Sequence, residues 1–179
     1  MTGLRVKLAI GIAVAGVGVT GAAAMAGGHR HIATTLSGYE ETPLALSTTG
    51  NGSFTARIQH GGGSIAYELE YAELEGSVTQ AHIHFGAKAQ TGGISVFLCS
   101  NLGNGPAGTQ PCPPAPARVT GTIEPDDVIG PAAQGISAGE FDELLQAIRA
   151  GVAYANVHST LYPGGEIRGQ FDDHEHHDD

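Results

Sequence analysis

Regular alternation of polar and apolar residues is the feature that most constrains this fold, and it is clear in Ala81–Phe85, within a predicted strand over residues 78–85. Alternation of this kind is typical of a half-buried β-strand. Successive side chains of a strand point to opposite faces, so His82 and His84 share one face, with their Cα atoms about 6.6 Å apart. Two imidazoles placed in this way could bind one metal ion or anchor a network of hydrogen bonds.

Strand-like segments of the same kind recur along the chain. We predict further strands over residues 32–36, 53–59, 64–71, 94–98, 118–123, 152–159 and 166–171. Glycine-rich turns separate several of them, for example residues 61–63 and 163–165. Short strands with frequent turns predict a mainly β fold, an antiparallel, Greek-key-like β-sandwich.

One segment departs from the β pattern. Ser137 and Glu140 have the spacing of a capping box, and apolar residues follow at helical spacing from Phe141 to Ile148. Gly151 stands where such a helix would end. We therefore predict one amphipathic helix over residues 138–150, packed across an edge of the sandwich.

The first 26 residues have the pattern of a secretory signal peptide. Arg5 and Lys7 precede an apolar run over residues 8–19, and residues 24–26 have the small-x-small pattern of a cleavage site. The run is shorter than the roughly 20 residues that span a bilayer. Cleavage would leave a flexible arm over residues 27–31 and no transmembrane anchor, in a secreted or periplasmic protein. The alternative is an uncleaved N-terminal anchor.

The charge of the chain limits its partners, and its two cysteines indicate a covalent link. The chain has 18 Asp and Glu residues against 8 Lys and Arg residues, and an acidic surface repels phosphate backbones, so we expect no nucleic acid partner. Cys99 and Cys112 are its only cysteines. In an exported protein such a pair is most simply a disulfide, and the alternative is a pair of soft metal ligands.

A third histidine lies on a strand that could neighbour the first two. If residues 152–159 pair near Val78–Phe85, then His82, His84 and His158 form a three-histidine site that suits zinc or copper. Glu166 could then accept a hydrogen bond from a ligating imidazole and orient it. The alternative is a purely structural network, in which the same histidines bond to polar neighbours such as Asn156.

Two further candidates for metal binding lie at the chain ends. After cleavage at Ala26 the chain would begin Gly27-Gly28-His29. Its free amine, two amide nitrogens and imidazole supply the planar nitrogen set that Cu(II) and Ni(II) prefer. The acidic, histidine-rich tail over residues 172–179 is expected to be disordered and can hold divalent cations loosely. The alternative at each end is a solvated terminus without a ligand.

Four stretches resemble the CHRD domain, the repeat named for chordin. They are residues 36–43 (LSGYEETP), 81–84 (AHIH), 154–159 (YANVHS) and 163–170 (PGGEIRGQ). They follow the family order and predict a single domain over residues 32–171. The resemblance implies an extracellular β-sandwich module, whereas the insert that holds Cys99 and Cys112 departs from the shortest family members.

No catalytic motif is evident. A Gly-x-Ser-x-Gly elbow is absent, and Ser159 directly follows His158, so their side chains point to opposite faces of a strand. We therefore predict an exported CHRD binding or structural module of the cell envelope or medium, with a protein or a divalent cation as its ligand. The alternative is an extracytoplasmic copper- or zinc-binding protein that uses the three histidines, and a metal-dependent redox enzyme is a more distant one.

Overall fold

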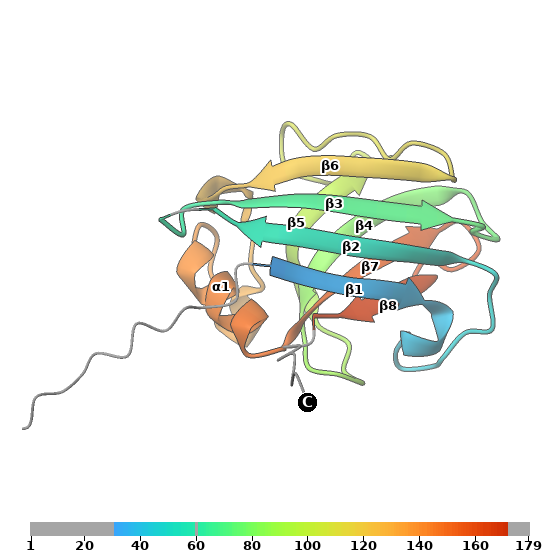
Figure 1. The fold of residues 1–179 in the computed structure, drawn as a ribbon, viewed down its shortest axis with the longest axis horizontal. Coiled ribbons are helices and arrows are strands. Elements are labelled where there is room, and N and C mark those ends of the chain that lie inside the picture. The colour runs from blue at the N-terminus through green and yellow to red at the C-terminus, as the bar shows by residue number, and fades with distance from the viewer. Residues whose placement is uncertain (1–30, 60, 172–179) are drawn as a thin grey trace, which may run out of the picture.

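The computed structural model describes residues 31–59 and 61–171. The predicted signal peptide, the Gly27-Gly28-His29 motif and the 172–179 tail lie outside the described residues. Figure 1 shows the elements that follow one another along the described part. In chain order they are β1 (His31–Ser37), η1 (Gly38–Glu40), β2 (Asn51–Ile58), β3 (Ile65–Ala72), β4 (Val78–Phe85), β5 (Gly93–Ser100), β6 (Ala117–Ile123), η2 (Pro125–Asp127), η3 (Ala132–Gln134), α1 (Phe141–Arg149), β7 (Ala153–Ser159) and β8 (Ile167–Gln170).

The strands form one antiparallel sheet that folds over on itself. Their order is β5-β4-β7-β8-β1-β2-β3-β6. The sheet bends back on itself between β8 and β1, which are joined by a single residue pair, Ser37 and Arg168. The half with β1, β2, β3 and β6 therefore packs against the half with β5, β4, β7 and β8 (Figure 1). This arrangement confirms the predicted mainly β, antiparallel architecture, with the two layers as halves of one nearly closed sheet.

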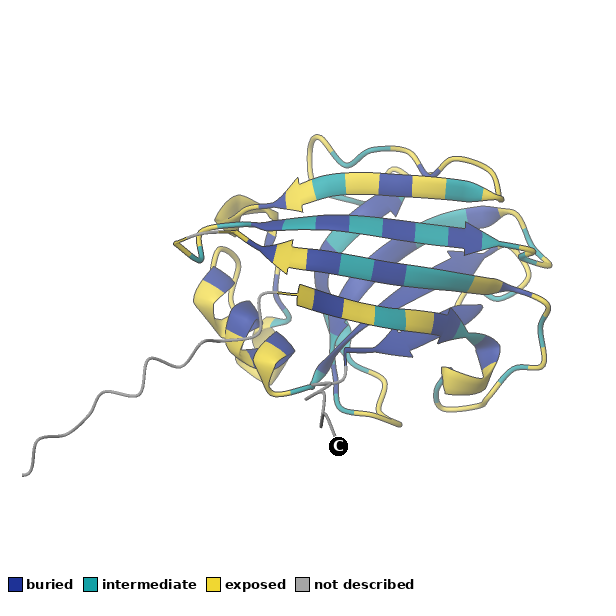
Figure 2. Cartoon of the chain, viewed as in Figure 1, coloured by how far each residue is buried: buried dark blue, intermediate teal, exposed yellow. Residues whose placement is uncertain are grey.

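The predicted strands are all present, and their ends differ from the prediction by at most two residues. The alternation works as expected in β3, where Ile65 and Leu69 are buried and Glu68 and Glu70 are turned outward. Figure 2 shows this alternation as bands along the front strands. Each large apolar side chain that is buried in this way contributes roughly 1.5–3 kcal/mol to folding.

Helix α1 covers one end of the sandwich (Figure 1) and buries Phe141, Leu144 and Ile148 against the core. It begins three residues later than predicted. The Glu140 carboxylate accepts a hydrogen bond from the Ser137 backbone N–H, as a capping box requires. However, Gly139 lies between them with a φ of 83°, which is incompatible with a right-handed helix. None of the described helices is long and apolar enough to cross a membrane.

Strands β7 and β8 are exceptions to the alternation, because all of their residues are buried. Their inner faces contact the core, and their outer faces carry polar residues. Two segments cover that outer face. Glu41 from residues 38–50 bonds to Asn156, and backbone carbonyls from residues 86–92 bond to Arg168. A polar layer is therefore enclosed between strands and loops, and it contains the candidate site.

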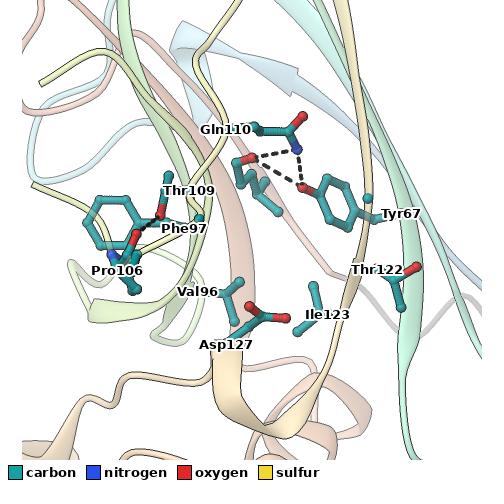
Figure 3. Close-up of a pocket in the computed structure, with 13 residues that line it drawn as sticks. Tyr67, Val96, Phe97, Pro106, Thr109, Gln110, Thr122, Ile123 and Asp127 are labelled. Carbon is teal, nitrogen blue, oxygen red and sulfur yellow. Dashed lines mark hydrogen bonds between the residues drawn. The ribbon is translucent and has the colours of Figure 1, made fainter. Parts of the chain in front are cut away.

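The sheet does not close completely between β5 and β6. The predicted disulfide is confirmed, and it joins Cys99 on β5 to Cys112 in the loop between β5 and β6. Near it, the Gln110 side chain donates hydrogen bonds to Leu98 O on β5, to Thr120 O on β6 and to the Tyr67 hydroxyl. Figure 3 shows Gln110 and Tyr67 at the edge of a pocket of about 260 Å³. One side chain thus bridges two strands that do not pair directly.

Candidate metal centre

The three predicted histidines lie on two directly paired strands, β4 and β7. Their register places His82 opposite Asn156, His84 opposite Tyr154 and Gln80 opposite His158. Because side chains alternate between faces, His82, His84 and His158 lie on the same outer face. The pairing of β4 with β7, which the sequence left open, therefore brings the histidines of two distant segments together.

The three imidazoles lie close together. One ligand atom from each of His82, His84 and His158 lies within 4.8 Å of the other two. The ring centroids of His82 and His158 are 4.9 Å apart, and those of His82 and His84 are 5.3 Å apart. Among the described residues, this is the one group of three or more His, Cys, Asp or Glu side chains with ligand atoms this close.

Backbone carbonyls orient two of the imidazoles. His84 donates from Nδ1 to the carbonyl oxygen of Gly92 at 3.0 Å, and His158 donates from Nδ1 to that of Pro163 at 3.1 Å. A carbonyl oxygen only accepts hydrogen bonds, so both protons lie on Nδ1 and both Nε2 atoms carry a lone pair. Metal-ligating histidines are oriented in the same way, with the second ring nitrogen bonded to a carbonyl or carboxylate.

The third imidazole completes the pattern. His82 Nδ1 lies 3.1 Å from His158 Nε2. Since that Nε2 carries a lone pair, His82 donates from Nδ1, and its own Nε2 is left with a lone pair as well. Two nitrogens bound to one ion at about 2.0–2.1 Å, with an angle of about 100° at the ion, would lie about 3.1 Å apart. The observed separation suits this hydrogen bond, and it would match two neighbouring metal ligands only with His82 binding through Nδ1 and its proton moved to Nε2.

Two of these lone pairs have no partner. The Nε2 atoms of His82 and His84 are buried and accept no hydrogen bond from the described residues. Burial, together with the neighbouring His158 and His84, lowers the pKa of His82 to about 2. Burial also lowers the pKa of His84 and of His158 to about 4. All three rings are thus neutral at neutral pH, and their lone pairs are available to a cation other than a proton.

Aromatic rings surround the cluster. The Phe97 ring meets His82 edge-on, with centroids 4.4 Å apart and an interplanar angle of 83°. Tyr154 stacks on His84, with centroids 4.9 Å apart and an interplanar angle of 3°. The guanidinium carbon of Arg168 lies 3.6 Å from the centroid of the Tyr154 ring. Because β7 lies between β4 and β8, Tyr154 separates the arginine from the histidines.

Arg168 also holds the segment that orients His84. Its guanidinium donates to the carbonyl oxygens of Ala87 and Gln90 and to the Thr42 hydroxyl. The alternation in the sequence indicated the faces on which Tyr154 and Arg168 lie. No sequence signal indicated that residues 86–92 fold back over them, because that contact is made by backbone atoms.

Glu166 does not have the predicted role of orienting an imidazole. It is completely buried, and its Oε1 accepts hydrogen bonds from the Thr48 hydroxyl at 2.9 Å and from the Glu75 backbone N–H at 2.6 Å. A buried carboxylate is stabilised strongly by such donors, so the loops before β2 and β4 capture it. The carbonyls of Gly92 and Pro163 orient the imidazoles instead.

A second carboxyl group lies on the same polar face. The Asn156 side-chain amide donates to both carboxylate oxygens of Glu41, at 2.9 and 3.2 Å. Burial raises the pKa of Glu41 to about 7, although Asn156 and Arg168 oppose the shift. This pair fastens residues 38–50 over β7, and sequence reasoning did not identify Glu41 as part of the site.

Comparison with known proteins gives one match. The family model described as the CHRD domain matches residues 32–171, which is most of the chain. No curated protein and no solved structure matches the chain. The matched range contains every residue of the three-histidine cluster and of its surroundings.

Proposed function

The chain belongs to the CHRD domain family, and on that basis we propose that it is an exported module that binds a transition metal ion, copper or zinc. Family membership supports a binding or structural role, and a disulfide fits a secreted protein. In this proposal the ion is the ligand of the module, and His82, His84 and His158 hold it. No catalytic step is part of the proposal.

The unpartnered lone pairs of His82 and His84 are the observation that carries the proposal. A buried polar atom without a partner lowers the stability of the fold by about 1–3 kcal/mol. A purely structural network would have this cost at two atoms of one cluster. Protonation would relieve the cost, but burial opposes it at both rings. A metal ion would accept both lone pairs and that of His158, and it would replace the hydrogen bond between His82 and His158.

Metal binding in this site requires a small contraction. Two nitrogens bound to the same ion lie at most about 4.2 Å apart, whereas the ligand atoms of the cluster spread over up to 4.8 Å. Side-chain rotations must therefore bring them closer together. His84 and His158 retain a little exposure, 7 % and 6 %, whereas His82 is completely buried.

We also propose that the protein is exported and that its signal peptide is removed. The pattern over residues 1–26 supports cleavage after Ala26. Such cleavage would create the Gly27-Gly28-His29 site for Cu(II) or Ni(II), and mass spectrometry of the mature N-terminus tests it. A different mature terminus would remove that site without affecting the three-histidine cluster.

Metal analysis of the full chain, purified without an affinity tag, tests the proposal. We expect the wild type to bind about one more equivalent of copper or zinc than an H82A/H84A variant does. This difference separates the cluster from the histidines at the chain ends. An H31A variant, which removes an exposed histidine of β1, serves as the matched control. If wild type and H82A/H84A bind the same amount of metal and neither shows a metal-dependent thermal shift, the proposal is wrong.

A further inference from the structure

We infer that the three-histidine site is selective for monovalent copper, Cu(I), over Zn²⁺ and Cu(II), because its ligands are all neutral and a buried arginine lies beside it. The inference rests on the proposed function, since it specifies which ion the same site takes. Three features of the described residues carry it: the ligand set, the burial and the charge of Arg168.

The ligand set contains no anion. Around His82, His84 and His158, no Asp, Glu or Cys side chain of the described residues has a ligand atom close enough to join the cluster. Zn²⁺ takes four ligands in most protein sites and often includes thiolate or carboxylate among them. Cu(I) carries a single charge and is satisfied by two or three nitrogen ligands. Three imidazoles can therefore complete the coordination of Cu(I), whereas Zn²⁺ would need a further ligand such as a water molecule.

Burial favours the ion of lower charge. His82 is completely buried, and His84 and His158 are almost completely buried. The cost of moving an ion from water into a medium of low dielectric constant rises with the square of its charge, so it is about four times larger for a divalent than for a monovalent ion. Neutral imidazoles do not compensate this cost with opposite charge, as a carboxylate would.

Arg168 adds a positive charge on one side of the cluster. It is 1 % exposed, its guanidinium lies against the Tyr154 ring that stacks on His84, and no carboxylate of the described residues lies within ion-pair distance of it. Its repulsion is twice as large for a divalent ion as for a monovalent one.

The buried acids of this face bond to groups other than the imidazoles. Glu41 bonds to Asn156, and Glu166 bonds to the loop atoms around Thr48 and Glu75. Neither carboxyl group bonds to an imidazole. Glu41 is also only partly ionised at neutral pH, because burial raises its pKa to about 7.

Competition titrations on the full chain test the inference. Cu(I) is titrated without oxygen against the chelator bathocuproine disulfonate, and Zn²⁺ and Cu(II) are titrated separately against chelators of known affinity. The contribution of the cluster is the difference between wild type and H82A/H84A. We expect this contribution to be at least about 100-fold tighter for Cu(I) than for Zn²⁺ or Cu(II). Equal or tighter binding of a divalent ion would overturn the inference and leave the proposed function standing, whereas binding of no ion would overturn both.

An R168Q variant tests the role of the arginine. Removing its charge should tighten Zn²⁺ binding about 10-fold and Cu(I) binding only about 3-fold, because the repulsion scales with ionic charge. R118Q is the matched control, since Arg118 is exposed and pairs with Glu68 and Glu70 on the opposite layer. Equal changes for both ions in R168Q would show that Arg168 does not set the selectivity. If R168Q does not fold, the wild-type titrations alone decide the inference.

Discussion

The Nδ1 atom of His84 donates a hydrogen bond to the carbonyl oxygen of Gly92, 3.0 Å away, across the turn that joins β4 to β5. The backbone N–H of Gly92 in turn donates to the Tyr154 hydroxyl at 3.0 Å. Gly92 has no room for a side chain, because a Cβ atom there would collide with the carbonyl oxygen of Phe85. The direction of the His84 lone pair therefore depends on how residues 86–92 are held against β7.

A Y154F variant should weaken metal binding while it preserves the aromatic ring. The ring can still stack on His84, but the Gly92 N–H loses its acceptor. We expect a loss of about 1–3 kcal/mol in the free energy of unfolding and about a 10-fold loss of metal affinity, as for other groups that orient ligands. Urea denaturation and metal titration measure the two effects. Y39F, at an exposed tyrosine, is the control, and an unchanged metal affinity in Y154F would contradict the assigned role.

The stability of the metal-free protein should fall as the pH is lowered from 7 to 5. The pKa values of His82, His84 and His158 are lower in the folded state than the ordinary value of 6.5. The unfolded chain therefore binds more protons below pH 6.5, and folding loses about 1.4 kcal/mol per pH unit for each histidine that stays neutral. Urea denaturation at several pH values measures this slope. It should be smaller in H82A/H84A, and an equal slope would mean that these rings already take up protons in the folded state.

Relative to wild type, an E41Q variant should become more stable as the pH rises. The pKa of Glu41 is raised to about 7 in the folded state, so ionisation of this buried carboxyl group destabilises the wild type as the pH rises through 7. Glutamine carries no charge and can still accept a hydrogen bond from Asn156. We expect E41Q to gain about 1–3 kcal/mol relative to wild type between pH 5 and pH 8. Unfolding measurements at both pH values test this expectation, with E40Q as the exposed control. A difference that does not vary with pH would contradict it.

Loss of the Gln110 hydrogen bonds that link β5 to β6 should destabilise this side of the sandwich. In Q110A the carbonyls of Leu98 and Thr120 lose a shared donor, and we expect a cost of about 1–3 kcal/mol. Faster hydrogen exchange in β5 and β6, with β1 and β2 unchanged, would be the signature. Uniform exchange rates across the sheet in Q110A would contradict a local role for Gln110.

Removing the disulfide in C99A/C112A should lower the free energy of unfolding by roughly 3 kcal/mol, because the disulfide closes a loop of 13 residues.

The strands and the disulfide could be predicted because their signals are local. Alternation along Ala81–Phe85 identifies a strand without any knowledge of its neighbours. The start of α1 was predicted too early because the capping pattern around Ser137 and Glu140 is present, while Gly139 between them adopts a left-handed conformation.

The role of Glu166 could not be predicted for a different reason. Alternation gives the face on which a residue lies, but it does not say which backbone N–H groups from other loops reach that face. The donors that capture Glu166 belong to Thr48 and Glu75, which are about 118 and 91 residues away along the chain.

The sequence alone determined the family, the β architecture, the cysteine pair and the placement of His82 with His84 on one face, since these follow from short-range patterns. Only the tertiary structure decided that β4 pairs with β7, which brings His158 to them. It also decided that loops cover this face, and this burial keeps the imidazoles neutral and leaves two lone pairs without partners. Strand pairing and loop closure depend on contacts between distant segments, and no local pattern encodes them.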